Sequence, residues 1–305
     1  MENKDTSNIV HLVDLVDTRI PDSVCEEVKY ILSLMFESPD VSRFESVFSD
    51  IVALFNSEYE GYQKCTTDYH DLTHTLDVLL AMARLMHGYS IANNHLSEKS
   101  VCLGIVSTLM HDTGYIQSAG DTTGTGAKYT LIHISRSIAF MEKYFKDNGY
   151  RKSDFDFCSN CIWCTNISED VTGFPFSSRE EEIVGKMLGI TDLMGQMADR
   201  NYLEKLILLY IEFEEGKVQG FNSEFDLLEK TIGFFNFTKK RFSEYLGNLN
   251  KYMIYHFIER WNIHEDLYKR AFNKNAEYLE YIIENNPETY YTFLRRDGIL
   301  DELHR

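Results

Sequence analysis

The stretch FESVFSDIVALF (residues 44–55) shows the apolar spacing that decides the fold class. Its apolar side chains recur every three or four residues, which is the period of one face of an α-helix and not the alternation of a β-strand. A second stretch of this kind lies within residues 203–211. The apolar positions are Phe44, Val47, Phe48, Ile51, Leu54 and Phe55 in the first stretch, and Leu203, Leu206, Ile207, Tyr210 and Ile211 in the second.

The rest of the chain keeps this helical pattern. Alternating strand patterns are scarce, and Gly/Pro hairpin signals are absent. Pro21, Pro39 and Pro287 are each predicted to stand at the start of a helix, where proline is well tolerated. We therefore expect an all-α fold with a single compact multi-helix domain over residues 21–305, preceded by an N-terminal extension over residues 1–20.

Composition narrows the class of protein. The 305 residues contain 48 Asp and Glu against 30 Lys and Arg, a net charge of −18 that repels a phosphate backbone and argues against a nucleic-acid polymer as partner. No segment approaches the roughly 20 apolar residues of a membrane span. The polar N-terminus, MENKDTSN, is unlike a secretory signal, and six cysteines are few for a disulfide scaffold. We expect a cytoplasmic protein that is not bound to a membrane.

The densest chemical signal begins at YHDLTHTLDV (residues 69–78). His70 and His74 are four residues apart, so we expect both on one face of a helix. His111 and Asp112 close the apolar run VCLGIVSTLM (residues 101–110). Asp192 lies in the otherwise apolar segment KMLGITDLMGQM (residues 186–197), where an unpaired carboxylate is costly and metal ligation would remove the cost.

His74, His111, Asp112 and Asp192 together form a set of four nitrogen and oxygen donors. Such a set suits zinc, manganese or iron. A carboxylate that bridges two ions could also hold a second, harder cation such as magnesium or manganese. The sequence therefore predicts two divalent metal ions.

This spacing resembles that of the HD superfamily of metal-dependent phosphohydrolases. Residues 69–78 are similar to the signature Y-H-N-x-x-H-A-x-D-V of cyclic-nucleotide phosphodiesterase catalytic domains. Four later segments resemble that domain in the same order, so the resemblance covers most of the chain and implies its all-α fold. They are ISRSIAFM (134–141), CIWCTNIS (161–168), LLYIEFEEG (208–216) and KTIGFFNF (230–237).

The resemblance also implies roles for individual residues. It makes His70 the general acid that protonates the leaving oxygen, and Asp112 the bridge between the two ions. His133 corresponds to a histidine near the second metal. Arg136, three residues after His133, is a candidate contact for a substrate phosphate.

Four residues are candidates for the substrate pocket. Tyr69 precedes the catalytic motif, and Tyr115 replaces a histidine that the family places near the second metal. Phe234 stands where the family stacks a base. Thr231 stands where the family reads the purine edge with glutamine, and threonine is too short for that two-point contact. We therefore expect weak discrimination between adenine and guanine.

The function expected from these observations is metal-dependent hydrolysis of a phosphoester, with a cyclic nucleotide or related phosphodiester as the small-molecule substrate. One alternative is a nucleotidase or phosphomonoesterase that uses the same metal site. Another is a non-catalytic sensor that binds metal and nucleotide. A homodimer is compatible with each of these three functions.

Three further features have weaker implications. The Gly-rich stretch 114–126 and residues 168–178 are predicted to be long loops that form lids or site walls. The acidic run Glu212, Glu214 and Glu215 is predicted to be a solvated helix face. The spacing of Cys158, Cys161 and Cys164 favours small apolar side chains on one helical face over the alternative of a zinc or iron–sulfur site.

Overall fold

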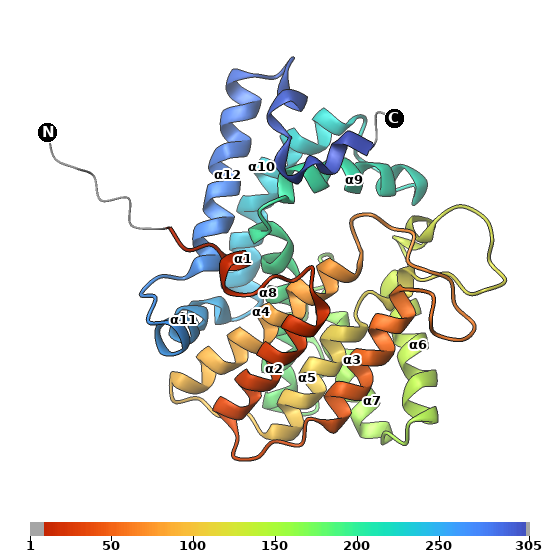
Figure 1. Cartoon of the computed structure of the whole chain (residues 1–305), viewed down its shortest axis with the longest axis vertical. Helices are drawn as coiled ribbons and strands as arrows, with labels where there is room; N and C mark the ends of the chain where they lie inside the picture. Colours follow the sequence, from red (N-terminus) through yellow and green to blue (C-terminus); the bar gives the residue numbers. More distant parts are fainter. Residues whose placement is uncertain (1–8, 303–305) are drawn as a thin grey trace, which may run out of the picture.

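A computed structural model describes residues 9–302 of the chain (Figure 1). Over this range it contains helices and no β-strand, and an isolated antiparallel bridge joins Tyr62 to Ser118. The predicted all-α class is confirmed. The α-helices are α1 (Leu12–Leu15), α2 (Pro21–Met35), α3 (Ser42–Phe55), α4 (Leu72–Ile91), α5 (Glu98–Met110), α6 (His133–Asp147), α7 (Lys152–Trp163), α8 (Arg179–Ala198), α9 (Tyr202–Glu215), α10 (Glu224–Lys240), α11 (Met253–Trp261) and α12 (Leu267–Asn285). Short helical turns are η1 (Thr113–Tyr115), η2 (Gly126–Tyr129), η3 (Val171–Gly173), η4 (Arg241–Tyr245), η5 (Leu249–Tyr252), η6 (Tyr290–Phe293) and η7 (Arg296–Glu302).

Three helices, α4, α5 and α8, form the centre of the molecule. Each is apolar on nearly all sides, which is the pattern of a helix buried within a large core. Helix α4 packs against α2, α5, α8 and α11, and α8 also contacts α7 and α12. Figure 1 shows α9, α10 and α12 on one side of this centre, and α2, α3, α6 and α7 on the other. The central helices therefore join two groups of outer helices.

The two apolar stretches used to predict the fold differ in how completely they are buried. All six apolar positions of residues 44–55 lie in the core on α3. On α9, Leu203, Leu206 and Ile207 are buried, whereas Tyr210 is half-buried and Ile211 is exposed. The second stripe is therefore narrower than predicted.

Two of the three predicted helix starts at proline are wrong. Helix α2 does begin at Pro21. Helix α3 begins at Ser42, because the Asp40 carboxylate accepts the Ser42 amide at 3.1 Å and sets the first turn beyond Pro39. Pro287 follows the end of α12 at Asn285, where a residue without an amide hydrogen cannot continue the helix.

The described segment before α2 packs against the helical core, and three cysteines are buried near α7. Residues 1–8 of the predicted N-terminal extension lie outside the described residues; within residues 9–20, Val16 packs into the core and Arg270 donates to the Val10 carbonyl oxygen. Cys158, Cys161 and Cys164 are all buried among apolar side chains at α7. Among the described helices, none has both the length and the apolarity needed to cross a membrane.

Gly114 lets the end of α5 approach the start of α6 closely. A Cβ atom at this position would lie 2.0 Å from the carbonyl oxygen of His133. The Gly114 amide donates to the Ser137 hydroxyl at 2.8 Å, and that hydroxyl donates to the His111 carbonyl at 2.6 Å. This contact fixes the turn that carries His111 and Asp112 against the helix that carries His133.

We predict that Gly114→Ala destabilises the fold, because the new methyl group must push the turn away from α6. Overpacking of this kind costs about 1–3 kcal/mol, so the melting temperature should fall by several degrees. Gly120→Ala is the matched control, since a Cβ atom there meets nothing within 4 Å. Equal melting temperatures for the two variants would contradict the proposed close approach.

Candidate metal centre and pocket

Four side chains from three helices converge at the centre of the molecule. His74 lies in the first turn of α4, His111 and Asp112 follow the last residue of α5, and Asp192 lies within α8. The His74 Nε2 atom is 3.2 Å from Asp112 Oδ2 and 3.4 Å from Asp192 Oδ1. The His111 Nε2 atom is 3.3 Å and 3.6 Å from the same two oxygens. The structure thus brings together all four predicted first-metal residues.

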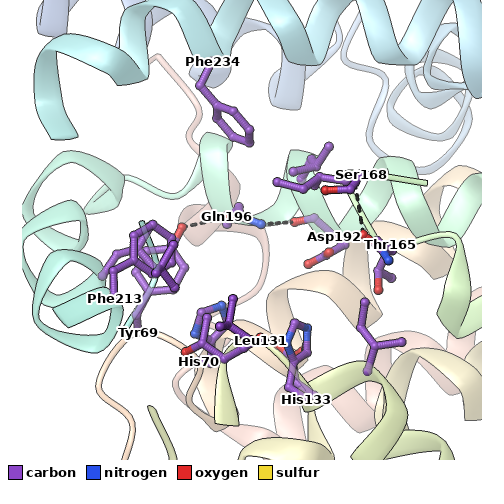
Figure 2. A pocket seen from close by; sticks show the side chains of 18 of the residues that line it. Tyr69, His70, Leu131, His133, Thr165, Ser168, Asp192, Gln196, Phe213 and Phe234 are labelled. Atoms are coloured by element: carbon purple, nitrogen blue, oxygen red, sulfur yellow. Dashed lines mark hydrogen bonds and ion pairs between the residues drawn. The ribbon is translucent and has the colours of Figure 1, made fainter. Parts of the chain in front are cut away.

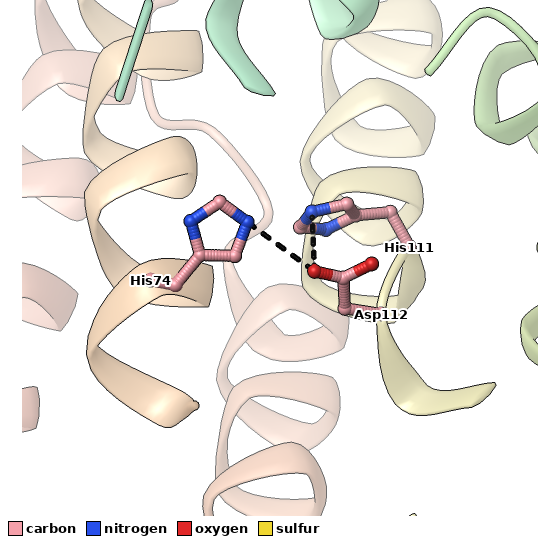
Figure 3. A group of neighbouring side chains, drawn as sticks. All are labelled: His74, His111 and Asp112. Carbon is pink, nitrogen blue, oxygen red and sulfur yellow. Dashed lines mark ion pairs between the residues drawn. The ribbon is translucent and has the colours of Figure 1, made fainter. Parts of the chain in front are cut away.

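The orientation of these groups fits a metal ion better than a set of hydrogen bonds. Despite the short distances, the buried Nε2 atoms of His74 and His111 have no hydrogen-bond partner of good geometry. Both point at the same oxygen of Asp112 (Figure 3). The donor atoms of His74, His111 and Asp112 all lie within 4.8 Å of one another. Imidazole nitrogens and carboxylate oxygens that face one point are the arrangement that a transition metal ion takes.

Neighbouring groups hold the ligands in place. The Asp71 carboxylate accepts the His74 amide at 2.8 Å and caps α4. The His111 Nδ1 atom donates to the Thr108 carbonyl oxygen at 2.7 Å, which leaves Nε2 as the nitrogen available to a metal. Hydrogen bonds of this type fix the tautomer and ring orientation of metal-bound histidines.

The charges of the four residues balance in the absence of a metal. Burial disfavours the charged imidazolium, but the neighbouring carboxylates of Asp112 and Asp192 outweigh it and raise the pKa of His74 to about 9. The same two carboxylates raise the pKa of His111. Against the opposing effect of burial, the two histidines lower the pKa values of Asp112 and Asp192. At neutral pH we therefore expect the cluster to hold two imidazolium and two carboxylate groups.

The second oxygen of Asp112 faces a different histidine. The His133 Nε2 atom lies 3.9 Å from Asp112 Oδ1, on the side of the carboxylate away from His74 and His111. Its Nδ1 atom donates to the Thr130 carbonyl oxygen at 2.6 Å. The pKa of His133 is lowered, chiefly by burial, which favours the neutral form that a metal or its water would need. Asp112 is thus placed to bridge two cations.

His70 stands beside this cluster and is oriented by a residue that the sequence analysis missed. Its Nδ1 atom donates to Glu212 Oε2 at 2.6 Å, and Glu212 Oε1 accepts the Tyr69 amide at 2.7 Å. Glu212 is buried, so its assignment to a solvated helix face is wrong. The predicted helical face shared by His70 and His74 is also wrong, because α4 begins at Leu72 and His70 lies in the preceding turn.

Tyr115 lies between the two histidines next to the cluster. Its ring stacks on His70 at 4.3 Å and on His133 at 4.7 Å between ring centroids. Its hydroxyl is 3.5 Å from His70 Nε2. Burial raises the pKa of the Tyr115 phenol well above its usual value, so the hydroxyl keeps its proton. Tyr115 therefore fixes the planes of both imidazole rings.

A pocket of about 920 Å³ opens above these residues (Figure 2). His70, Asp112, His133 and Asp192 lie in its lining. The remaining walls come from residues 130–135, from residues 163–168, from the inner faces of α8, α9 and α10, and from the loop between α9 and α10. Of the two predicted loops, 114–126 contributes Tyr115 and 168–178 contributes Ser168, so most of each loop lies away from the pocket.

The pocket lining includes three residues predicted for the substrate pocket, Tyr69, Thr231 and Phe234. It also includes Gln196, which was not predicted from the sequence. The side-chain Oε1 atom of Gln196 accepts a hydrogen bond from the Tyr69 hydroxyl at 2.5 Å. Its side-chain Nε2 atom donates to the backbone carbonyl oxygen of Asp192 at 3.1 Å. The Thr231 hydroxyl donates to the Leu227 carbonyl at 2.8 Å. Gln196 could have been found from the sequence, because it follows Asp192 by four residues on the same helical face.

The prediction that Arg136 contacts a substrate phosphate is wrong. Its Nε atom donates to the Gly114 carbonyl at 2.7 Å, and a terminal nitrogen donates to the Ile116 carbonyl at 3.0 Å. The guanidinium also lies 3.5 Å from the centroid of the Tyr129 ring. Arg136 is not in the lining of the pocket and instead secures the segment between α5 and α6.

We predict that one divalent cation displaces the protons of His74 and His111 when it binds the metal-free protein. Metal ligation needs neutral imidazoles, and His74 with a pKa of about 9 is protonated at pH 7. Calorimetric titration with Zn²⁺ in buffers of different ionisation enthalpy should therefore show the release of about two protons at pH 7. Release should decline as the pH rises through 9. A proton count near zero at pH 7 would contradict the charge assignment.

The same titration should distinguish the metal-binding residues from His70. Asp192→Ala should abolish tight binding, because it removes a carboxylate that faces both Nε2 atoms. His70→Ala is the control and should retain binding, since His70 pairs with Glu212 outside the four-residue cluster. Equal loss of metal in both variants would make His70 a ligand.

The comparison with known protein families places the whole site within one matched segment of the chain. No curated protein matches the chain. The model of the Npun_R2479-like family matches residues 40–277, a span that includes every residue of the metal centre and pocket described above. The resemblance to HD phosphohydrolases stays a prediction. Because the match covers more than half of the 305 residues, the chain belongs to the Npun_R2479-like family.

Proposed function

We propose that this protein is a metal-dependent phosphohydrolase that cleaves a phosphodiester, with a cyclic nucleotide or a related diester as substrate. The observation that carries the proposal is the convergence of His74, His111, Asp112 and Asp192 at the floor of a large pocket, with His70 and His133 beside them. Divalent cations held there would supply positive charge to the phosphoryl oxygens and activate a water for attack.

The position of Asp112 supports a site for two cations. One of its oxygens faces His74 and His111, and the other faces His133. Zinc, manganese or iron suits the first position because of its two imidazoles. The second position has one imidazole at 3.9 Å from the carboxylate and suits a harder, more hydrated cation such as magnesium or manganese.

His70 is placed to give a proton to the leaving oxygen. Its Nδ1–H bond to the Glu212 carboxylate, at 2.6 Å, orients the ring. The Nε2 atom is then the one that faces the pocket, next to the Tyr115 hydroxyl. Glu212 acts through His70 and is a positioning residue. Proton donation of this kind contributes on the order of 10²–10⁴ in rate.

Apart from the metal centre and His70, the pocket offers little positive charge, which favours a diester over a monoester. Lys230 is the one lysine or arginine in the described lining, and it pairs with Asp226 at 2.7 Å and also donates to the Gly220 carbonyl at 2.6 Å. A monoester carries up to two negative charges and usually meets additional lysine or arginine side chains. A singly charged diester needs less compensation. Hydrolysis of a monoester by the same residues is the second candidate.

The proposal predicts hydrolysis of bis(4-nitrophenyl) phosphate by protein loaded with Zn²⁺ or Mn²⁺. With an alkoxide leaving group, as in a cyclic nucleotide, His70→Ala should lower kcat about 10²- to 10⁴-fold while metal content is unchanged. Glu212→Gln should lower kcat about 10- to 100-fold while metal content is unchanged, because it weakens the hydrogen bond that orients the His70 ring. Glu214→Gln, on the exposed face of α9, is the matched control.

Absence of hydrolysis of any diester or monoester by metal-loaded protein would contradict the proposed activity and favour the non-catalytic sensor. Full activity of Glu212→Gln would contradict only the role of the His70–Glu212 pair.

Cyclic AMP and cyclic GMP should be cleaved with similar efficiency. The Thr231 hydroxyl already donates a hydrogen bond to the Leu227 carbonyl oxygen, so it does not contact the edge of a bound base. The Phe234 ring, which lines the same wall of the pocket, can still stack on the base. The ratio of kcat/KM values should therefore stay below about a hundredfold, or about 2.7 kcal/mol. A larger ratio would show that another residue reads the base.

A further inference from the structure

The walls of the pocket above the metal centre are mainly apolar. Leu206, Leu209 and Phe213 line it from α9, and Leu193 lines it from α8. Phe234 lies on the far side from His70 and His133, as Figure 2 shows. The volume of about 920 Å³ is near the upper end of the range for small-molecule sites. A phosphate group at the floor leaves most of this space for the rest of the substrate.

Three polar side chains along these walls, Gln196, Thr165 and Thr231, are engaged within the protein. Both ends of the Gln196 amide are bonded, to Tyr69 and to the Asp192 backbone. The hydroxyls of Thr165 and Thr231 donate to carbonyls one turn earlier in their own segments. Such groups cannot pair with a ligand without breaking these bonds. The walls therefore suit an apolar substituent better than the edge of a base.

The mouth of the pocket is lined by exposed apolar side chains from three separate segments. Leu131 is 69% exposed and Ile132 is 52% exposed in the segment before α6. Ile167, after α7, is 46% exposed, and Phe237, on α10, is 42% exposed. Exposed apolar side chains that gather at one opening mark a binding surface, whereas isolated ones are ordinary. We call these four residues the apolar rim.

We propose that the substrate is an amphiphilic phosphodiester. Its phosphate group lies at the metal centre, and one ester substituent is a long alkyl or similarly apolar group that runs along the walls and reaches the apolar rim. The inference rests on the proposed function for the reacting group, and on the walls and rim for the substituent. Among the diesters of the proposed function, it favours those that carry a long apolar substituent.

The reaction remains a simple hydrolysis. The oxygen of water forms a bond to phosphorus, and the bond from phosphorus to one ester oxygen breaks, its electron pair leaving on that oxygen. The departing alkoxide takes the proton from His70 Nε2, and a proton of the attacking water restores the imidazolium. The products are a phosphomonoester and an alcohol, so no oxidant, reductant or second substrate is needed.

Binding of n-alkylphosphonates to Zn²⁺-loaded protein tests the substituent without turnover. Trp163 lines the pocket and Trp261 lies on α11, so a Trp261→Phe background isolates a fluorescence signal from the site. Between butyl- and octylphosphonate, each kept below its micelle concentration, we expect Kd to fall by up to about fourfold per methylene. The octyl compound should bind at least tenfold more tightly than the butyl compound.

Two leucine variants locate the effect. Leu131→Ser should reduce the ratio of butyl to octyl Kd values, because it removes the most exposed side chain of the apolar rim. Leu34→Ser is the matched control; Leu34 is 43% exposed on α2, outside the lining of the pocket, and the variant should keep the wild-type ratio. An equal fall in both variants would show a general surface effect and overturn the proposed path of the chain.

The outcomes separate this inference from the proposed function. Equal Kd values for the butyl and octyl compounds, together with hydrolysis of cyclic AMP, would overturn the amphiphile and leave the phosphohydrolase standing. Chain-length dependence that Leu131→Ser reduces would support the binding path even if no diester were cleaved, and in that case the proposed activity would fail. A kcat/KM that rises from methyl to octyl 4-nitrophenyl phosphate would support both.

Discussion

The balance of charge among His74, His111, Asp112 and Asp192 is the constraint on which the centre of this protein depends. Isolated charges in a core are unstable, and here two carboxylates and two imidazoles lie within a few ångströms of one another. Without a metal, protons on the imidazoles make the cluster neutral. With one divalent cation in place of two protons, it is neutral again. The same residues can therefore be buried in both states.

The cluster forms where the start of α4, the end of α5 and the middle of α8 meet. Asp71 starts α4 one turn before His74, and the His111 side chain returns to the Thr108 carbonyl at the end of α5. Gly114 then lets the chain pass close to α6, so that Asp112 meets His133. Since α8 packs on α4, α5 and α7, a small shift of any central helix would separate the donors. Stability and metal binding are therefore expected to be linked.

Sequence reasoning succeeded where the signal lay within one element. The apolar stripe of residues 44–55 and the cost of an unpaired Asp192 in an apolar segment are both local properties, and both led to correct placements. Sequence reasoning failed where a residue's hydrogen-bond partner lies far away along the chain. His70 and Glu212 are separated by 142 positions, and the acidic run around Glu212 resembled a solvated face. The spacing of four residues from buried Leu208 to Glu212 was the available signal. Arg136 was placed by its distance from His133 in the sequence, but its guanidinium is held by two backbone carbonyls.

A transition metal held by two imidazoles and the carboxylates at the junction of α4, α5 and α8 is detectable by X-ray absorption spectroscopy of protein loaded with one equivalent of Zn²⁺. We expect nitrogen and oxygen ligands at about 2.0–2.2 Å with the multiple scattering of two imidazoles. The contradicting result is sulfur scattering at about 2.3 Å, which would place the metal at the buried cysteines of α7, or a first shell without imidazole.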